Sequence, residues 1–418
     1  MKFIYFSLFT LCNIFVNAQN IPLYVGTYTA DGSEGIYYYD FNTSTGEITN
    51  KKLAVKTENP SFITFSSDKK YLYAVNENGD AGFVKAYKVN TDGPLAFINE
   101  VSTNGKAPCY VQLNKSNTKL VVSNYTSGTF SIYNILKNGS INEADQVFDH
   151  TIEGVKSHAH SAKFYKNNLF VADLGRDFLA QYVLKNKKYA LKENHNMVKG
   201  AGPRHFEISK KGAFIYVINE LNSTITVLQK ETKNNYTTIQ SLKTLTGEFI
   251  GKNQCADIHL SADEEFLYGS NRGENTIAVF KRNVKNGMLK KIQNISVNGD
   301  WPRNFTLSPN GNFLIVANER SKNISIYSVN KISGLAQQES SKFLNQLFSS
   351  TSKEGIVKLE NKVVLFRINN SKFAEYNKTR DDGVKESLIQ LQEEELMTNL
   401  IKKLENSFEI QSSIQEKE

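Results

Sequence analysis

The chain has 418 residues, of which 40% are hydrophobic, 22% charged and 11% aromatic, and its formal net charge at pH 7 is +8. This composition is ordinary for a soluble protein, and the length is sufficient for a large core. Lys and Arg residues are scattered along the whole chain, which is typical of a solvated surface, so we expect no nucleic-acid partner.

Residues 1–18 have the pattern of a signal peptide. Lys2 precedes an apolar run from Phe3 to Val16, and Val16-Asn17-Ala18 supplies small residues for cleavage after Ala18. The apolar run is too short for a comfortable membrane span. We therefore expect no membrane span, and export of the mature protein to a periplasm.

A strand-like phrase, apolar and ending in a small or polar residue, occurs seven times at nearly constant spacing. The copies end at Thr27, Asn76, Asn124, Asp173, Asn219, Asn271 and Asn318, which gives steps of 49, 48, 49, 46, 52 and 47 residues. A period of about 40–50 residues rich in short strands is typical of a β-propeller with four strands per blade. The sequence therefore predicts an all-β, seven-bladed β-propeller over residues 21–335.

Each repeat has the same internal order. A first strand such as Pro60–Phe65 is followed by a turn, the repeated phrase, a second turn and an alternating third strand such as Ile324–Val329. No first strand precedes Ile21, so the sequence leaves open how blade one is closed. Cys109 and Cys255 fall in different blades, which predicts two buried thiols rather than a disulfide.

Residues 336–418 have no repeat character. Segments 355–358 and 362–368 predict a β-hairpin, and leucines at roughly helical spacing predict a helix over about 382–407. We interpret this part as a small α+β C-terminal appendage. It is either an added module or foreign sequence joined to a truncated propeller.

Aligning the predicted first strands gives a column of residues near their starts, and the residues that follow the repeated phrase give a second column. The first column is Ser61, Cys109, His160, Arg204, Ala256 and Arg303. The second is Tyr28, Glu77, Tyr125, Leu174, Glu220, Arg272 and Glu319. First strands line the central channel of a propeller, so we expect both columns near one channel mouth.

The two columns predict a positive pocket. His160, Arg204 and Arg272 come from neighbouring blades, with Glu220 beside Arg204 and Arg303 one blade further. Guanidinium groups bind carboxylate or phosphate and stabilise an oxyanion, and His160 or Glu220 could take a proton from water. The alternative interpretation is that these are ordinary channel residues paired in structural salt bridges.

Other chemistries have weaker signals. His158 and His160 lie two apart, which on a strand permits metal binding, but no further ligand stands at suitable spacing, so we expect no metal and no cofactor. We expect His205 and His259 to pack or hydrogen-bond locally. The chain has no Gly-x-Ser-x-Gly elbow, no His-Glu-x-x-His and no phosphate-cradling glycine loop, which argues against covalent serine chemistry.

At these residues the chain resembles the seven-bladed propeller lactonases typified by bacterial 6-phosphogluconolactonase, with fungal 3-carboxymuconate cyclases as relatives. The matching stretches run in order over residues 23 to about 335, and they are 24–29, Ser123-Asn124-Tyr125 with Gly128, 157–161, 171–175, 202–205, 219–221, 270–273 and 301–305. The tail resembles the C-terminal part of parvulin-type periplasmic folding factors.

In keeping with this resemblance, our leading hypothesis is metal-independent hydrolysis of an anionic sugar-type lactone, and we expect a monomer. The resemblance places the catalytic residues on His160, Glu220, Arg204 and Arg272, and we take the neighbouring Arg303, His158 and His205 as candidate substrate-binding residues. Two alternatives stay open. One is a non-catalytic propeller that binds an acidic glycan or a protein partner, and the other is a metal-dependent propeller lactonase.

Overall fold

The computed structural model describes residues 20–231, 235–338, 354–359 and 362–367. The chain divides into two compact units, Met1–Asn345 and Gln346–Glu418, and each is described by itself. The signal peptide predicted at 1–18 and the helix predicted at 382–407 lie outside the described residues. In the described part of the chain, no helix has the length and apolar character needed to cross a membrane.

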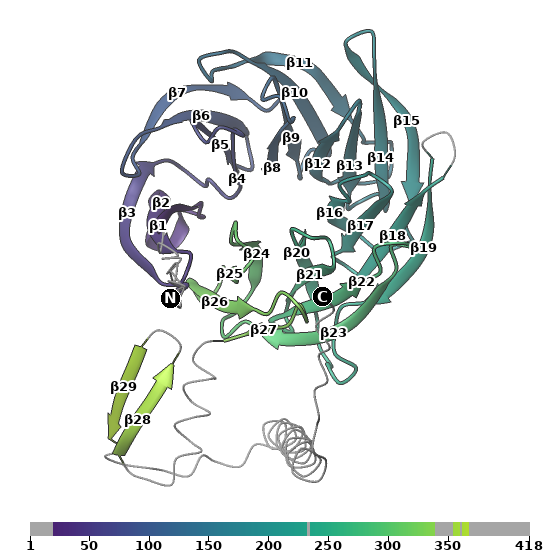
Figure 1. Cartoon of the computed structure of the whole chain (residues 1–418). Helices are drawn as coiled ribbons and strands as arrows, with labels where there is room; N and C mark the ends of the chain where they lie inside the picture. Colours follow the sequence, from purple (N-terminus) through teal and green to yellow (C-terminus); the bar gives the residue numbers. More distant parts are fainter. Residues whose placement is uncertain (1–19, 232–234, 339–353, 360–361, 368–418) are drawn as a thin grey trace, which may run out of the picture. The chain divides into compact units, whose positions relative to one another are not determined.

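The first unit is a ring of seven blades around a common axis (Figure 1). This confirms the predicted propeller. The repeated phrase forms the second strand of each blade. These strands are β1 (Asn20–Val25), β5 (Tyr71–Asn76), β9 (Lys119–Asn124), β13 (Asn168–Asp173), β17 (Phe214–Asn219), β21 (Phe266–Arg272) and β25 (Phe313–Asn318).

The other strands complete antiparallel sheets in chain order, as in β4-β5-β6-β7. The first strands are β4 (Ile63–Phe65), β8 (Pro108–Leu113), β12 (Ala159–Tyr165), β16 (Pro203–Ile208), β20 (Gln254–Leu260) and β24 (Pro302–Leu307). The third strands are β2 (Gly35–Asn42), β6 (Phe83–Val89), β10 (Thr129–Ile135), β14 (Phe178–Lys185), β18 (Thr224–Lys230), β22 (Thr276–Arg282) and β26 (Asn323–Val329). The fourth strands are β3 (Ile48–Lys56), β7 (Leu95–Ser102), β11 (Ile141–Asp149), β15 (Lys188–Asn196), β19 (Tyr236–Lys243), β23 (Leu289–Ser296) and β27 (Ala336–Gln337). A 3-10 turn, η1 (Ala30–Gly32), follows β1.

Blade 1 differs from the other six. Within the described residues it has three strands, in the order β1-β2-β3, and no first strand covers the channel side of β1. Five of the six residues of β9 are buried. In β1 only Tyr24 is buried, and the other five residues are exposed or half-buried. Among the described residues, the ring therefore begins with a strand that corresponds to the second strand of the other blades.

The last blade nevertheless packs directly against the first and closes the ring. Phe41 of β2 meets Phe313 of β25 edge to face, with 5.8 Å between the ring centroids, and Ile315 joins the same buried cluster. The side-chain amide of Asn310 donates a hydrogen bond to the carbonyl of Thr43 at 2.8 Å. Apolar packing thus holds blade 7 on blade 1.

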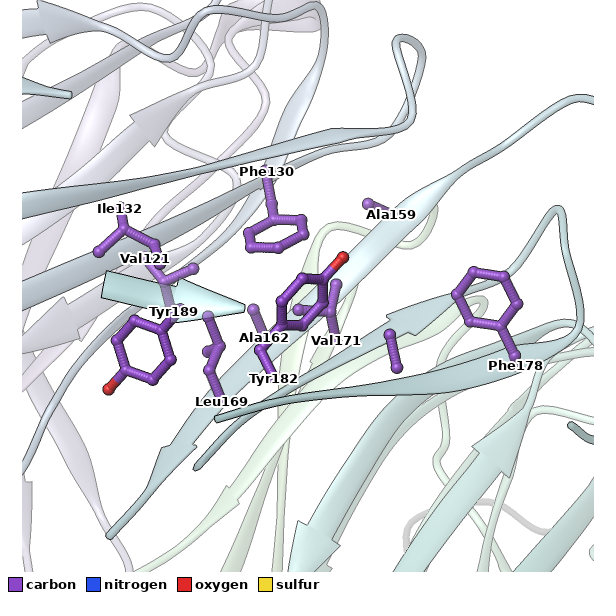
Figure 2. Packing of buried hydrophobic residues seen from close by; sticks show 11 residues of the cluster. Val121, Phe130, Ile132, Ala159, Ala162, Leu169, Val171, Phe178, Tyr182 and Tyr189 are labelled. Carbon is purple, nitrogen blue, oxygen red and sulfur yellow. The ribbon is translucent and has the colours of Figure 1, made fainter. Parts of the chain in front are cut away.

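The core lies between the faces of neighbouring blades. Figure 2 shows the cluster between blades 3 and 4, where side chains from both sheets interdigitate. The rings of Phe130 and Tyr182 meet edge to face at 5.1 Å between centroids. Because each blade packs on both neighbours, the second and third strands are apolar on both faces, and this explains why the repeated phrase is nearly all hydrophobic.

One blade-to-blade hydrogen bond recurs around the ring. A tyrosine of a second strand donates its hydroxyl to a glycine carbonyl in the turn between the last two strands of the next blade. The pairs Tyr24–Gly93, Tyr73–Gly139, Tyr216–Gly287 and Tyr268–Gly334 all measure 2.9 Å. Gly334 has a φ of 74°, and a Cβ there would collide with the ring of Phe266, so the turn requires glycine.

This bond gives a stability prediction. Tyr268→Phe should lower the free energy of unfolding by about 1–2 kcal/mol, because it leaves the buried Gly334 carbonyl without its donor. Urea unfolding followed by tyrosine and tryptophan fluorescence measures the change. Tyr71→Phe is the matched control, since Tyr71 makes a long, exposed bond of 3.4 Å to the Lys137 carbonyl. An equal loss in both variants would contradict the assignment.

In the second unit the described residues form one antiparallel hairpin. β28 (Glu354–Leu359) pairs with β29 (Lys362–Arg367) from Glu354 opposite Arg367 to Leu359 opposite Lys362. The hairpin coincides with the β-hairpin predicted at 355–358 and 362–368. β27 pairs with β26, so blade 7 extends two residues beyond the predicted end of the propeller at residue 335. The other domain limits given from the sequence stay predictions.

Candidate active site

The predicted first column coincides with a repeated irregularity in the first strands. Five of these strands have a register shift near their start, and the residues within it are Cys109, His160, Arg204, Ala256 with Asp257, and Arg303. A β-bulge sets two residues opposite one, so it re-aims side chains and interrupts the alternation of faces. The bulges explain how consecutive residues such as Arg204 and His205 line the same cavity.

Two arginines share one carboxylate at the centre of the site. Glu220 Oε2 lies 3.0 Å from Arg204 Nε and 2.7 Å from Arg272 Nη2. The Arg204 contact is an ion pair without the angle of a hydrogen bond. All three residues are buried: Arg204 is 2% exposed, Glu220 8% and Arg272 3%. The structure thus brings together three of the four predicted catalytic residues, from blades 5 and 6.

The backbone and an aromatic ring fix Arg272. Its Nε and Nη2 donate to the carbonyls of Gln254 and Cys255, each at 3.1 Å. Its guanidinium lies 5.1 Å from the centroid of the Trp301 ring, and Arg320 stacks on the same ring at 3.3 Å. Burial and the nearby Arg204 lower the pKa of Arg272 to about 10, so it remains a cation at neutral pH.

His160 lies near enough to Arg204 and Arg272 to be affected by their charges. It is buried, its ring centroid is 5.2 Å from that of His205, and its Nδ1 is 3.7 Å from the sulfur of Cys109. Burial holds the pKa of His160 well below its usual value, and the positive charge of Arg204 lowers it further. His160 is therefore a neutral imidazole at physiological pH. Cys109 and Cys255 are free buried thiols, as predicted.

His158 takes a different position. It precedes β12, and the bulge at His160 means that the two histidines do not follow the alternation of one strand face. Its ring stacks on Tyr125 at 4.4 Å, and its Nδ1–H donates to the Tyr125 carbonyl at 2.8 Å. Within the described ranges, no three His, Cys, Asp or Glu side chains are grouped as metal ligands.

Arg303 belongs to a second polar group on the same mouth. Its Nη2 donates to the Tyr28 hydroxyl at 2.6 Å, and that hydroxyl donates to Glu77 at 2.7 Å. Its Nε lies 3.5 Å from Glu319, and Ser61 also hydrogen-bonds to Glu77. Each of these five residues belongs to one of the two predicted columns, so the prediction that the columns meet at one face is consistent with the geometry.

A cavity of about 730 Å³ opens beside these groups. Arg204, His205 and Arg303 line it, together with Tyr28 and Glu319 from the two ends of the ring. Small-molecule sites typically occupy about 300–1,000 Å³. The cavity therefore has room for a sugar-sized ligand in contact with two guanidinium groups.

One residue of this region, Asp257, is not predicted from the sequence. Asp257 is buried in β20 and accepts a hydrogen bond from Nδ1 of His205 at 2.8 Å and one from Nε2 of His259 at 3.1 Å. Asp257 follows Ala256 of the first column, and regular alternation would turn it away from the channel. No pattern in the sequence marks the bulge that reverses its direction.

The fold and the site define a class of protein, a seven-bladed propeller with an arginine-lined cavity. A family model described as "Lactonase, 7-bladed beta-propeller" matches residues 22–347. The chain belongs to this seven-bladed propeller lactonase family, whose name denotes hydrolases of cyclic esters. The resemblance stated from the sequence is thereby confirmed for the propeller, whereas the likeness of the tail to folding factors stays a prediction.

Individual relatives agree with this membership. A 6-phosphogluconolactonase of Bacillus subtilis is 32% identical over 320 residues, covering 74% of this chain and 92% of that protein. A 6-phosphogluconolactonase of Formosa agariphila is 36% identical over 334 residues, covering 73% and 91%. The structure of a periplasmic gluconolactonase of Pseudomonas aeruginosa is 30% identical, with a TM-score of 0.73 and coverage of 77% and 95%.

Proposed function

We propose that this protein hydrolyses a sugar-type lactone, without a metal, at the channel mouth that holds Arg204, Arg272, Glu220 and His160. The observation that carries the proposal is the pair of buried arginines on one carboxylate, of which Arg204 lines a sugar-sized cavity, together with the neutral imidazole of His160. Membership of the lactonase family and relatives named 6-phosphogluconolactonase support the reaction class.

The proposed reaction opens the ring by attack of water on the lactone carbonyl. Arg204 and Arg272 stabilise the negative charge that develops on the carbonyl oxygen. The neutral His160 takes a proton from the attacking water and returns one to the ring oxygen when the carbon–oxygen bond breaks. Glu220 holds the two guanidinium groups in place, and Arg303 attracts an acidic substituent of the substrate.

The test is a panel of aldono-lactones, with and without a phosphate group, given to the full-length protein while released acid is titrated at constant pH. We expect turnover well above spontaneous hydrolysis for at least one lactone, unchanged by EDTA. Saturable binding with no added acid release would favour the non-catalytic alternative. Loss of turnover on chelation, restored by a divalent cation, would favour the metal-dependent one.

The lowered pKa of His160 predicts the pH dependence. Because the unprotonated imidazole accepts the proton, kcat/KM should stay flat as the pH falls to 6.5 and should decline only below that value. Arg303→Gln removes one of the positive charges that depress the pKa of His160, so the decline should move to higher pH in that variant. A wild-type midpoint at or above pH 6.5 would exclude His160 as the base.

We also propose export, because residues 1–18 have the order of a signal peptide. The similar gluconolactonase of Pseudomonas aeruginosa is described as periplasmic. Mass spectrometry of the protein isolated from its host should find a mature N-terminus at Gln19. Full-length protein confined to the cytoplasm would show that the proposal is wrong.

A further inference from the structure

Asp257 is a buried carboxylate that accepts five hydrogen bonds. It is 3% exposed and lies in the bulge of β20, between the first strands of blades 5 and 7. Oδ1 accepts from His205 Nδ1 and from the Ile258 amide, at 2.8 and 3.0 Å. Oδ2 accepts from His259 Nε2, Asn304 Nδ2 and the Phe305 amide, at 3.1, 2.6 and 3.3 Å.

These contacts determine the tautomer of His205. A carboxylate oxygen only accepts, so Nδ1 of His205 must carry the hydrogen. Burial and the adjacent Arg204 lower the pKa of His205 to about 3, so the ring is neutral and Nε2 has no hydrogen. Nε2 lies 3.4 Å from Nη1 of Arg204 and faces it as an acceptor. In the Nε2–H tautomer, the hydrogen on Nε2 of His205 would point at a hydrogen on Nη1 of Arg204.

Arg204 is consequently held on two of its three nitrogens. Nη1 donates to the Ala256 carbonyl at 2.6 Å and faces His205, and Nε pairs with Glu220. None of the described residues accepts a hydrogen bond from Nη2, and Arg204 lines the cavity. The guanidinium fork is planar, so fixing Nη1 and Nε also fixes where Nη2 points.

We propose that Asp257 is a positioning residue for lactone hydrolysis: by holding His205 in the Nδ1–H tautomer it aims Nη2 of Arg204 into the cavity. The inference rests on the proposed function and deepens it. Asp257 does not line the cavity, whereas His205 and Arg204, through which it acts, do. It acts through the two bulged strands that set these three side chains in line.

The groups on the other side of Asp257 provide a control. His259 bridges Asp257 and Glu207, and Glu207 lies 3.0 Å from Lys163. These carboxylates raise the pKa of His259 to about 10, so it is an imidazolium. His259 therefore touches the same carboxylate as His205, but it does not contact the arginine of the site.

The variant Asp257→Asn separates the two roles. Three donors surround Oδ2 and two surround Oδ1, so the single oxygen of asparagine should take the Oδ2 position. The amide would then donate to Nδ1 of His205 and force its hydrogen onto Nε2, against Arg204. We expect kcat to fall on the order of 10-fold to 100-fold, less than on removal of an oxyanion donor itself. KM should change less than twofold.

The control is His259→Gln, in which the amide still donates to Asp257. It should lower the unfolding midpoint yet leave kcat within about twofold of wild type, because the bond between Asp257 and His205 remains. Equal losses of kcat in Asp257→Asn and His259→Gln would reduce Asp257 to a structural residue and overturn the proposal.

A second measurement needs no lactone and no variant. The ¹⁵N chemical shifts of His205 in the full-length wild-type protein should report the Nδ1–H tautomer from pH 5 to 9. An Nε2–H tautomer or an imidazolium in that range would overturn the positioning role even if Asp257→Asn failed to fold. If the tautomer is found but no lactone is turned over, the proposed function fails while the geometric inference stands.

Discussion

Replacing Arg204 by alanine should reduce kcat/KM for lactone hydrolysis about 100-fold to 1,000-fold, the usual effect of removing one donor to a developing oxyanion. The fold should persist, because Glu220 keeps its 2.7 Å ion pair with Arg272. Arg204→Lys should recover little activity, since a lysine has one charged nitrogen and lacks the planar fork that reaches both Glu220 and the cavity. Initial rates with the preferred lactone measure the change.

A buried arginine far from the site gives the matched control. Arg282 is 5% exposed, stacks on Phe214 and donates to the Glu264 carbonyl at 2.9 Å. It ends β22, which runs antiparallel to β21, so it lies at the opposite end of the blade from Arg272. Arg282→Ala should lower stability without lowering kcat/KM. Full activity in Arg204→Ala would remove Arg204 from the mechanism.

Glu220→Gln should produce the largest loss of stability. The substitution keeps the shape of the side chain but leaves two buried guanidinium groups without their anion. Breaking a buried ion pair by removing one partner typically costs about 3–5 kcal/mol. Turnover should also fall, because Arg204 and Arg272 repel each other once the carboxylate is gone. Equilibrium unfolding in urea, together with lactone rates in the folded range, measures both effects.

Glu264→Gln serves as the comparison. Glu264 pairs with the buried Arg282 at 4.0 Å, a looser contact to one arginine, and its own side chain is 16% exposed. We expect the free energy of unfolding to fall by about 1 kcal/mol, as for weak ion pairs. If Glu220→Gln were no more destabilising than this variant, the carboxylate would not be what holds the two arginines together.

The ring of blades could be predicted because its cause is local and repeated. Each copy of the phrase, such as Leu120-Val121-Val122-Ser123-Asn124, is largely apolar because it lies between two sheets, and each closes with a small or polar residue near the end of its strand. Because each blade contributes one copy at a near-constant step, the seven copies give the number of blades. The same reasoning placed Arg204, Arg272 and Glu220 at one mouth, where the structure pairs them.

The precise directions of the side chains could not be predicted, because they depend on bulges. Regular alternation would set Arg204 and His205 on opposite faces, yet both line the cavity. The same irregularity turns Asp257 toward His205, and regular alternation along β20 could not predict this direction. A bulge is a tertiary feature of paired strands, and neither spacing nor composition encodes it visibly.

The pairing of Arg303 also depended on the closed ring. From the sequence it was one more positive charge, whereas in the structure Tyr28 connects it to Glu77 across the junction of the last and first blades. Tyr28 and Arg303 are 275 positions apart in the chain. Only the curvature that brings blade 7 onto blade 1 sets them in contact, and that curvature is a property of the whole ring.

The position of a bound aldonic acid, the open-chain product of sugar-lactone hydrolysis, is the most direct test of the central claim. In a crystal of the full-length protein soaked with this product, its carboxylate should lie within hydrogen-bond distance of Arg204 Nη2, with its hydroxyl chain in the cavity beside Arg303. Product bound elsewhere on the protein, with the cavity at Arg204 empty, would contradict the account.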